Sequence, residues 1–418
     1  MNLYLFNDND SAATFGIGTY INELIHALES TGIHIFIVHL HSNRPEFEIE
    51  KTDDTGLNSV ENWYIPEVRN HRTFDGDVQQ IEDYFDNVIY LLRLYIQDTT
   101  DLVFHFNFNL CYRLAQGLKK MFNCKTVTTI HFMKWAFELQ GNTKKLLALK
   151  SKQVNQMSKY EQYLYATDEY EKMLYKEVDR VIVLSQYDKN FLCSEYQIDA
   201  GKIFVIPNGL NDSNAVLESK RNELRRKWHV SDKESLILFV GRLHQVKGLI
   251  FLMRAFRKVL EKMPDCRLLI AGSGYYDIYI QEAKEISAKV SFTGFLDKKD
   301  LSEIYQIADV GVVPSLYEPF GYVAIEMMMH SLPIVATATS GLNEVVDEAC
   351  GMKIPIIEQP ESIDMDTDLL SEKILYLFQN SNEASKLGQN GRKRFLQEYS
   401  SEVFRRNMME FYQTALNS

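Results

Sequence analysis

The sequence predicts an α/β protein with two domains, each built on a parallel sheet. Short runs of β-branched and aromatic residues alternate with amphipathic stretches along most of the chain, which is typical of parallel strands joined by covering helices. This alternation stops in a polar segment at about 208–230 and then starts again. A chain of 418 residues is also too long for one compact core. We therefore expect domains at 1–207 and 208–395, followed by a C-terminal helix at 396–418.

The first half of the chain contains the first series of predicted strands. Their buried, β-rich runs lie at 2–6, 33–40, 102–106, 126–130, 180–184 and 203–206. A helix is expected at 19–28, and the polar segment 143–175 is expected to be helical because it contains neither glycine nor proline. In residues 42–100 only a strand at 63–66 and a helix at 77–96 are indicated.

The second series of strands begins at 236–240 and has the same rhythm. Further strands are expected at 267–271, 290–293, 310–313 and 334–336, and helices at 246–262, 276–287, 298–307 and 322–330. After residue 367 the pattern is helical only. In the last helix Phe404, Met408 and Phe411 fall on one stripe, so this helix needs an apolar surface to pack against.

Composition and charge exclude several classes of protein. The chain has 45 basic and 57 acidic residues, a net charge of −12 and no basic block, so it is not expected to bind nucleic acid through phosphates. The first 100 residues hold 17 acidic and 5 basic residues, so peripheral contact with an anionic membrane is not favoured. No apolar run approaches the roughly 18 residues of a transmembrane segment. The five cysteines have neither zinc nor disulfide spacing, which fits a cytoplasmic protein.

Two basic residues follow the first strand of the second series. Arg242 and Lys247 lie on the loop GRLHQVKG, between that strand and the next helix. Ligands of parallel sheets bind beyond the carboxyl ends of the strands. There an arginine offers a planar fork to phosphate oxygens, and a lysine offers a point charge. The pattern indicates an anion site, and two solvated loop residues are the alternative interpretation.

A second candidate site lies in PSLYEPFGYVAIE, after a buried strand. A helix is expected to begin after Gly321, and its free amides, including those of Tyr322 and Val323, would bind an anion. Glu318 precedes this helix and Glu326 lies about one turn inside it, so their carboxylates could accept hydrogen bonds from sugar and ribose hydroxyls. The alternatives are an ordinary loop acid and a carboxylate placed favourably near a helix start.

The first half of the chain offers a glycine turn and a histidine. Gly16 and Gly18 follow the first strand and would let the backbone approach a phosphate closely. The dinucleotide fingerprint G-x-G-x-x-G requires glycine where this chain has Ile21, so a nicotinamide or flavin cofactor is not expected. His131 ends the strand TVTTI, where it would either hydrogen-bond a substrate or serve the packing of the core.

Taken together, these segments resemble the retaining GT-B glycosyltransferases of glycosyltransferase family 4. In that family's order and spacing, over about 180–348, the second series of strands carries FVGRLHQVKG, LLIAGSG, VSFTGFLDKKDL and ADVGVVPSLYEPFGYVAIEMMMHSLPIVATATSGLNEVV, and VIVLSQYDKNFL and VIPNGL lie upstream of it. The first half matches through FGIGTYINELIHAL and TIHF. The resemblance covers most of the chain apart from about 42–100 and 143–175. It implies the GT-B fold, in which two Rossmann-like domains face a cleft and the C-terminal helix crosses back to the first domain.

The resemblance also implies a nucleotide-sugar donor and roles for individual residues. Arg242 and Lys247 match the pair that holds the donor diphosphate. Glu318 matches the carboxylate that contacts the donor sugar, and Glu326 the one that contacts the ribose. His131 matches a histidine near the reacting sugar. Catalytic roles are therefore implied for Glu318, His131, Arg242 and Lys247.

The remaining donor contacts implied by the resemblance involve backbone and loop positions. Gly16 matches the glycine of the loop that closes on the phosphates. The family's contacts to the nucleobase fall around Phe295, and Phe320 and Gly321 match the loop whose backbone meets the sugar and phosphate. The amides of Tyr322 and Val323, expected at the helix start, would add to these donor contacts. Many members have aspartate where this chain has Phe132, so the acceptor side matches less closely than the donor side.

The implied reaction proceeds with retention and without a metal ion. The D-x-D spacing at 8–10 falls in a predicted turn, and no other metal-binding pattern is evident. Arg242 and Lys247 would neutralise the leaving diphosphate instead. Retention in the family is explained by front-side attack, in which the leaving phosphate takes the acceptor's proton. Glu318 is then an electrostatic and positioning group and not a nucleophile.

The donor is expected to be a UDP-sugar of the hexose type, and the acceptor stays open. Glycan, lipid-linked, small-molecule and peptide hydroxyls all fit, and the acidic first 100 residues suit a basic acceptor better than an anionic membrane surface. Two other functions share the fold: a non-catalytic partner or chaperone of an active transferase, and a GT-B nucleotide-sugar epimerase. The epimerases lack the EPFG…E block, and the intact cations and carboxylates argue against a non-catalytic partner.

Overall fold

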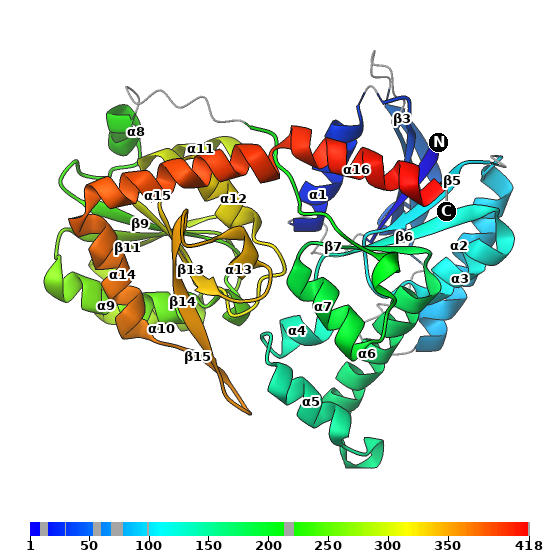
Figure 1. Ribbon diagram of the computed structural model, residues 1–418, viewed down its shortest axis with the longest axis horizontal. Coiled ribbons are helices and arrows are strands. Elements are labelled where there is room, and N and C mark those ends of the chain that lie inside the picture. Colours follow the sequence, from blue (N-terminus) through cyan, green and yellow to red (C-terminus); the bar gives the residue numbers. More distant parts are fainter. Residues whose placement is uncertain are drawn as a thin grey trace. The chain divides into compact units, whose positions relative to one another are not determined.

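A computed structural model describes the protein over residues 1–8, 16–29, 31–52, 60–67, 78–97, 100–212 and 221–416. The chain divides into two compact units (Figure 1). Unit 1 contains residues 1–135, 148–209 and 401–418, and unit 2 contains residues 136–147 and 210–400. Each unit has its own mostly parallel sheet with helices packed against it, so the prediction of two parallel-sheet α/β folds is confirmed.

In the described part of unit 1, the sheet has the strand order β3-β4-β2-β1-β5-β6-β7-β8. Its strands are β1 (Asn2–Asp8), β2 (His34–Ser42), β3 (Glu48–Thr52), β4 (Val60–Pro66), β5 (Leu102–Phe106), β6 (Cys124–Ile130), β7 (Arg180–Val183) and β8 (Ile203–Val205). β3 pairs antiparallel with β4, and the other pairs run parallel. The strand order reverses between β1 and β5, which is where sheets of this kind bind ligands.

The helices of unit 1 are α1 (Gly16–Leu28), α2 (Val78–Tyr95), α3 (Tyr112–Met121), α6 (Lys159–Glu177), α7 (Gln186–Glu195) and α16 (Ser401–Leu416). Two further helices, α4 (Lys134–Glu138) and α5 (Thr143–Ser151), contain residues of both units. The stretch 143–175, expected to be helical throughout, is interrupted between α5 and α6. The second helix begins after Ser158, which exchanges side-chain and backbone hydrogen bonds with Glu161 in a capping box.

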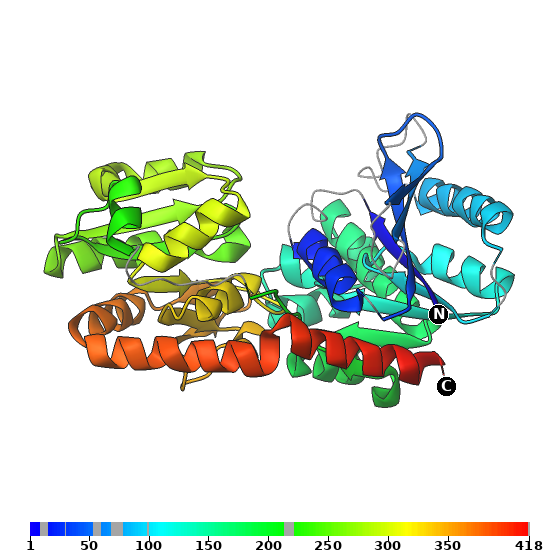
Figure 2. The same cartoon turned by 90° about the horizontal axis from the view of Figure 1, so that it is seen from above.

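The last helix, α16, packs against the rest of unit 1. Figure 2 shows α16 beside α1. Its Tyr412 hydroxyl lies 2.7 Å from Nδ1 of His105 on β5, and Nε2 of His105 lies 2.7 Å from Oγ1 of Thr129 on β6. Tyr20 on α1 meets Phe404 edge-on, with ring centroids 5.8 Å apart. Burial lowers the pKa of His105 to about 3, so this ring is a neutral core residue.

In the described part of unit 2, the sheet has the order β11-β10-β9-β12-β13-β14-β15. Its strands are β9 (Ser235–Val240), β10 (Cys266–Ala271), β11 (Val290–Gly294), β12 (Val310–Val313), β13 (Ile334–Ala338), β14 (Gly351–Glu358) and β15 (Ile363–Met365). β14 and β15 pair antiparallel, and the other pairs run parallel. Here the order reverses between β9 and β12.

The helices of unit 2 are α8 (Arg221–Lys227), α9 (Leu249–Lys262), α10 (Asp277–Ala283), α11 (Lys298–Ile307), α12 (Tyr322–Met329), α13 (Leu342–Val345), α14 (Thr367–Gln379) and α15 (Ser381–Arg394).

Three strands were not predicted: β3, β14 and β15. The expected final helix at 396–418 begins only at Ser401, because Phe395–Tyr399 form a wider π-helical turn.

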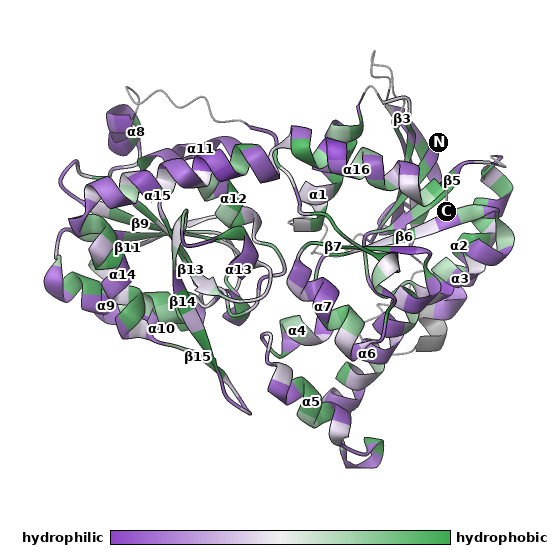
Figure 3. Cartoon of the chain, viewed as in Figure 1, coloured by the Kyte–Doolittle hydropathy of each residue, from purple (hydrophilic) through white to green (hydrophobic). Residues whose placement is uncertain are grey.

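Helix α9 illustrates how the helices cover their sheets. Leu249, Leu252, Phe256 and Val259 recur at helical spacing, and each is fully buried. Burying a side chain of this size contributes about 1.5–3 kcal/mol. Figure 3 shows hydrophilic and hydrophobic residues mixed along the helices, as expected of helices with one face on a sheet and one face in water.

The buried His105 predicts a pH-dependent stability of unit 1. The folded pKa of about 3 lies below the ordinary value of 6.5, so the unfolded chain binds the proton more readily, and stability falls as the pH drops below 6.5. Between pH 6.5 and pH 5 the loss from this group should be about 2 kcal/mol. Urea unfolding of wild type and His105→Asn at pH 7 and pH 5 should show a smaller acid loss in the variant. The exposed His34 supplies the control, His34→Asn; an equal acid loss in wild type and His105→Asn would contradict this account.

Candidate active site

The candidate site lies at the carboxyl ends of β9 and β12, the two neighbouring strands of unit 2 between which the strand order reverses. The loop after β9 carries Arg242 and Lys247, and the loop after β12 carries Glu318. Because these strands are adjacent and parallel, their following loops start side by side. The arrangement brings cations and a carboxylate from distant parts of the sequence to one edge of the sheet.

The loop after β9 is shaped by a close approach of two backbones. Gln245–Lys247 form a 3-10 turn that ends at Gly248, whose φ is +66°. A Cβ atom at Gly248 would lie 1.8 Å from the carbonyl oxygen of Pro314, the residue that follows β12. Only glycine satisfies both the left-handed conformation and this contact. Gly248 therefore holds the loop with Lys247 directly against the loop with Glu318.

This approach places Lys247 and Glu318 in contact. Nζ of Lys247 lies 2.5 Å from Oε2 of Glu318, and the hydroxyl of Ser315 donates to the same oxygen at 3.1 Å. The backbone amide of Glu318 donates to the hydroxyl of Ser340 at 3.0 Å, and that hydroxyl donates to the carbonyl of Glu318 at 2.7 Å. The pair is only partly exposed, so its charges are poorly screened by water. The carboxylate is thus fixed from both its side chain and its backbone.

The second loop ends in the amino end of α12. Gly321 precedes the helix with a φ of +105°, and a Cβ there would lie 3.0 Å from Leu342. Phe320 is buried between the rings of Tyr322 and Tyr399, with centroid distances of 5.7 Å to each. The helix start contains the backbone amides of Tyr322 and Val323. Amides at such a position carry a partial positive charge that suits a phosphate oxygen.

Glu326 lies within α12, and its carboxylate is held by a buried tyrosine. The hydroxyl of Tyr305 on α11 donates to Oε2 of Glu326 at 2.6 Å. Burial raises the pKa of Tyr305 well above its ordinary value, and the nearby Glu326 carboxylate raises it further, so the phenol keeps its proton. Tyr305 also stacks on His330, which follows the helix. The sequence predicted Glu326 as a site residue but not Tyr305, which no local signal marks.

Phe295 lies at the same edge of the sheet, directly after β11 and one residue beyond Gly294. Its side chain is 68% exposed, which is unusual for phenylalanine. In the same sheet β11 is separated from β9 by β10. The sequence prediction of a nucleobase contact at this position stays a prediction.

Two predicted site residues, Gly16 and His131, belong to unit 1. Gly16 is the first residue of α1, and a Cβ there would meet no atom of the described residues within 4 Å. His131 follows β6; its Nε2 lies 3.2 Å from Oδ1 of Asn107, and its ring meets Tyr20 edge-on at 4.6 Å. Desolvation lowers the pKa of His131 to about 3, so it is a neutral hydrogen-bonding group at physiological pH. The D-x-D spacing at 8–10 extends outside the described residues.

No group of three or more histidine, cysteine, aspartate or glutamate side chains is placed to hold a metal ion within the described ranges. No helix of the described chain has both the length and the apolar character that crossing a membrane requires.

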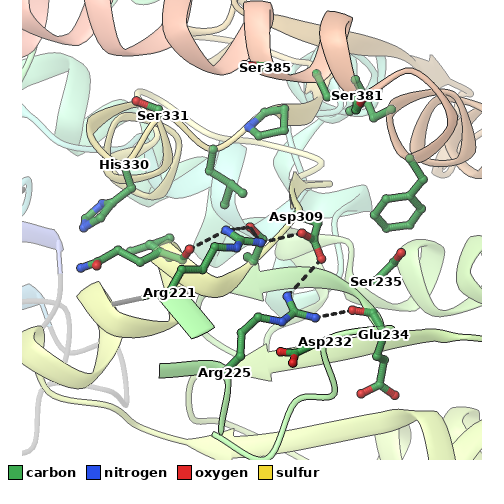
Figure 4. A pocket seen from close by; sticks show the side chains of 18 of the residues that line it. Arg221, Arg225, Asp232, Glu234, Ser235, Asp309, His330, Ser331, Ser381 and Ser385 are labelled. Carbon is green, nitrogen blue, oxygen red and sulfur yellow. Dashed lines mark hydrogen bonds and ion pairs between the residues drawn. The ribbon is translucent and has the colours of Figure 1, made fainter. Parts of the chain in front are cut away.

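A pocket of about 520 Å³ lies at the other end of the unit 2 sheet, beside the amino ends of β9 and β12 (Figure 4). Figure 4 shows Arg221 and Arg225 pointing toward Asp309. Arg221 donates to that carboxylate at 2.6 Å and to the carbonyl of Ile307 at 3.0 Å, and Arg225 donates to the carbonyls of Ile307 and Ser231 at 2.9 and 2.8 Å. These arginines satisfy the last carbonyls of α11, so their role is structural.

Comparison with known proteins identifies the fold class of the chain and its family. Sucrose-phosphate synthase from Thermosynechococcus elongatus superposes with a TM-score of 0.75 at 23% identity, over 100% of this chain and 99% of that one. HepE from Anabaena, solved in complex with UDP-glucose, superposes with a TM-score of 0.71 at 15% identity, over 99% of this chain and 100% of that one. These likenesses show that the fold is GT-B.

Two family models match the sequence. The model described as glycosyl transferases group 1 matches residues 220–394, and the model described as Glycosyltransferase Family 4 matches residues 15–214. The chain belongs to the group 1 glycosyltransferases of family 4, as the sequence resemblance predicted. An uncharacterized glycosyltransferase from Methanocaldococcus jannaschii is 41% identical over 174 residues, which are 40% of this chain and 44% of that protein. The chain spans about half the length of the curated relatives that it matches.

The contact between Gly248 and Pro314 predicts that a methyl group would disrupt the site. Gly248→Ala should destabilise the protein by about 2 kcal/mol or more, because alanine disfavours the left-handed backbone and its Cβ would overlap a carbonyl oxygen. Gly16→Ala is the matched control, since a Cβ there meets no neighbour among the residues that the structure describes and alanine favours a helix. Urea unfolding of both variants tests this. Equal stability of Gly248→Ala and wild type would contradict the geometry.

Proposed function

We propose that the protein is a retaining glycosyltransferase, which moves a hexose-type sugar from a UDP-sugar to an acceptor hydroxyl without a metal ion. The observation that carries the proposal is the ion pair of Lys247 and Glu318 at the strand-order reversal, on the same loops as Arg242 and the amino end of α12. Family membership supports transfer chemistry, and the GT-B neighbour HepE, solved in complex with UDP-glucose, supports the choice of donor.

The diphosphate would be held by fixed charges. Breaking the bond between the anomeric carbon and the phosphate oxygen leaves negative charge on the nucleoside diphosphate. Arg242, Lys247 and the amides at the start of α12 would neutralise that charge, and prearranged groups of this kind need no reorganisation during the reaction. In the structure the ammonium of Lys247 pairs with Glu318. A diphosphate would compete for this ammonium and leave the Glu318 carboxylate to accept hydrogen bonds from the sugar.

The remaining site residues have supporting roles in the proposal. Glu326, held in place by Tyr305, would accept hydrogen bonds from the ribose diol. The neutral His131 would hydrogen-bond the reacting sugar, and Gly16 would lie close to the phosphates. In front-side attack the acceptor oxygen bonds to the anomeric carbon on the face that the phosphate leaves. The acceptor's proton passes to that phosphate, so the reaction balances without a general base or a covalent intermediate.

The acceptor is proposed to be a glycan, lipid-linked, small-molecule or peptide hydroxyl without strong negative charge. The first 100 positions contain 17 acidic and only 5 basic residues. This charge supports the restriction, since it would repel a negatively charged acceptor. The protein is proposed to act in the cytoplasm. A panel of nucleotide sugars and acceptors, scored by release of the nucleoside diphosphate and by product mass, tests the function. Anomeric proton coupling in the product tests retention, and failure with every donor would overturn the proposal.

Removal of either member of the ion pair should nearly abolish turnover. Lys247→Ala and Glu318→Ala should each lower kcat by about 100- to 1,000-fold, because each loses a charged group that stabilises the transition state. Lys386→Ala serves as the control, since Lys386 is an exposed lysine on α15. Initial rates with a saturating donor measure the effect, and circular dichroism checks the fold. Rates like those of wild type in either variant would refute the assigned roles.

Chelation of divalent metals should leave activity unchanged. Fixed cations and helix amides carry the charge stabilisation in the proposed mechanism, so no exchangeable ion is required. Initial rates after dialysis against EDTA, compared with rates in excess Mg²⁺, give the measurement. Loss of activity in EDTA that returns with the metal would contradict metal independence but would not exclude sugar transfer.

A further inference from the structure

Residues 136–147 come from the first half of the sequence but belong to unit 2. The side-chain amide of Asn142 donates to the carbonyls of Gln359 and Ser362 at 2.8 and 3.2 Å. The hydroxyl of Thr143 and the amide of Lys144 donate to Glu358 at 2.8 and 2.9 Å. We call residues 136–147 the strap. These bonds anchor one end of the strap to the ends of β14 and β15.

The middle of the strap packs against the loop that carries Glu318. Gly141 has a φ of +80°, and a Cβ there would lie 3.2 Å from Cβ of Tyr317 and 3.4 Å from the carbonyl oxygen of Leu316. Gln140 lies within hydrogen-bond distance of Gln245, at 3.4 Å, in the 3-10 turn before Lys247. The strap therefore touches both loops of the candidate site.

One aromatic residue of the strap contacts the arginine of this site. The guanidinium carbon of Arg242 lies 5.3 Å from the ring centroid of Phe137, which is the geometry of a cation–π contact. The same phenyl ring stacks on His244, with centroids 4.7 Å apart and planes inclined by 27°. His244 in turn caps the 3-10 turn, because its Nδ1 accepts from the amide of Val246 at 3.3 Å.

We propose that Phe137 is a positioning residue, which orients the guanidinium of Arg242 for the diphosphate of the donor; this inference rests on the proposed function. An aromatic face attracts a guanidinium electrostatically and restricts its orientation, and the planar fork of an oriented arginine suits phosphate oxygens. An arginine whose rotamer is already restricted loses less entropy when it binds. Lys247 thus contacts a carboxylate, and Arg242 contacts an aromatic ring.

The test compares variants that keep or remove the aromatic face. Phe137→Leu preserves apolar bulk without the ring, and Phe137→Tyr restores the ring. Tyr376→Leu is the control, an exposed aromatic on α14 that lies outside the site. The Kd of UDP, GDP and ADP is measured by calorimetry, and KM and kcat are measured with the donor that wild type uses.

We expect Phe137→Leu to raise the Kd and the KM for the donor by about threefold to thirtyfold, the range of a cation–π contact. The effect on kcat should be smaller, because the orientation serves the bound donor and the transition state alike. Phe137→Tyr should bind like wild type. In the Arg242→Ala background, Phe137→Leu should cause little further loss, since the ring then has no guanidinium to orient.

Several outcomes would overturn the inference. Unchanged binding by Phe137→Leu, an equal defect in Phe137→Tyr, or a full additional loss in the Arg242→Ala background would each show that the ring does not act through Arg242. In these cases wild type still binds a nucleoside diphosphate, so the proposed function stands. If wild type binds none of the three nucleotides and uses no donor, the proposed function fails together with the inference.

Discussion

The candidate site depends on the approach of two loops that is possible only because Gly248 has no side chain. With a Cβ at this position the carbonyl of Pro314 would have to move, and the loop after β12 would move with it. The ion pair of Lys247 and Glu318 requires that approach, since the two residues are 71 positions apart in the sequence. The chemistry of the site is therefore determined by backbone contact first and by side chains second.

The ion pair explains how charged groups can be kept partly buried before a substrate binds. A partly desolvated ammonium or carboxylate alone would be unfavourable, and pairing offsets that penalty. The hydrogen bonds of Ser315 and Ser340 hold the carboxylate and its backbone while the lysine exchanges partners. Because the carboxylate is bound from several directions, loss of the lysine to a diphosphate would leave Glu318 oriented, which is what contact with a sugar hydroxyl requires.

The sequence allowed prediction of those parts that depend on local patterns. Buried β-rich runs predicted the central strands of both sheets, and positions at strand ends predicted that Arg242, Lys247 and Glu318 lie on loops at one edge of a sheet. Strands at and next to the sheet edges were missed because they lack such runs: the edge strand β3 is the charged segment EIEKT, and β14, which pairs with the edge strand β15, contains Pro355. Tyr305 was missed because its contact with Glu326 joins two helices and leaves no trace in either local sequence.

The strap belongs to unit 2 although it lies in the first half of the sequence. The domain boundary read from the sequence pattern therefore differs from the boundary between the two structural units. A boundary near residue 208, drawn from the restart of the strand–helix pattern, assigns every earlier residue to the first domain. The strap instead contributes bonds to Glu358 and an aromatic ring beside Arg242. The sequence pattern does not show that the strap belongs to unit 2, because a short covering segment has no periodicity that links it to the sheet it covers. The environment of Arg242 therefore depends on residues about 100 positions earlier, so the second half of the chain alone would lack part of the anion site's surroundings.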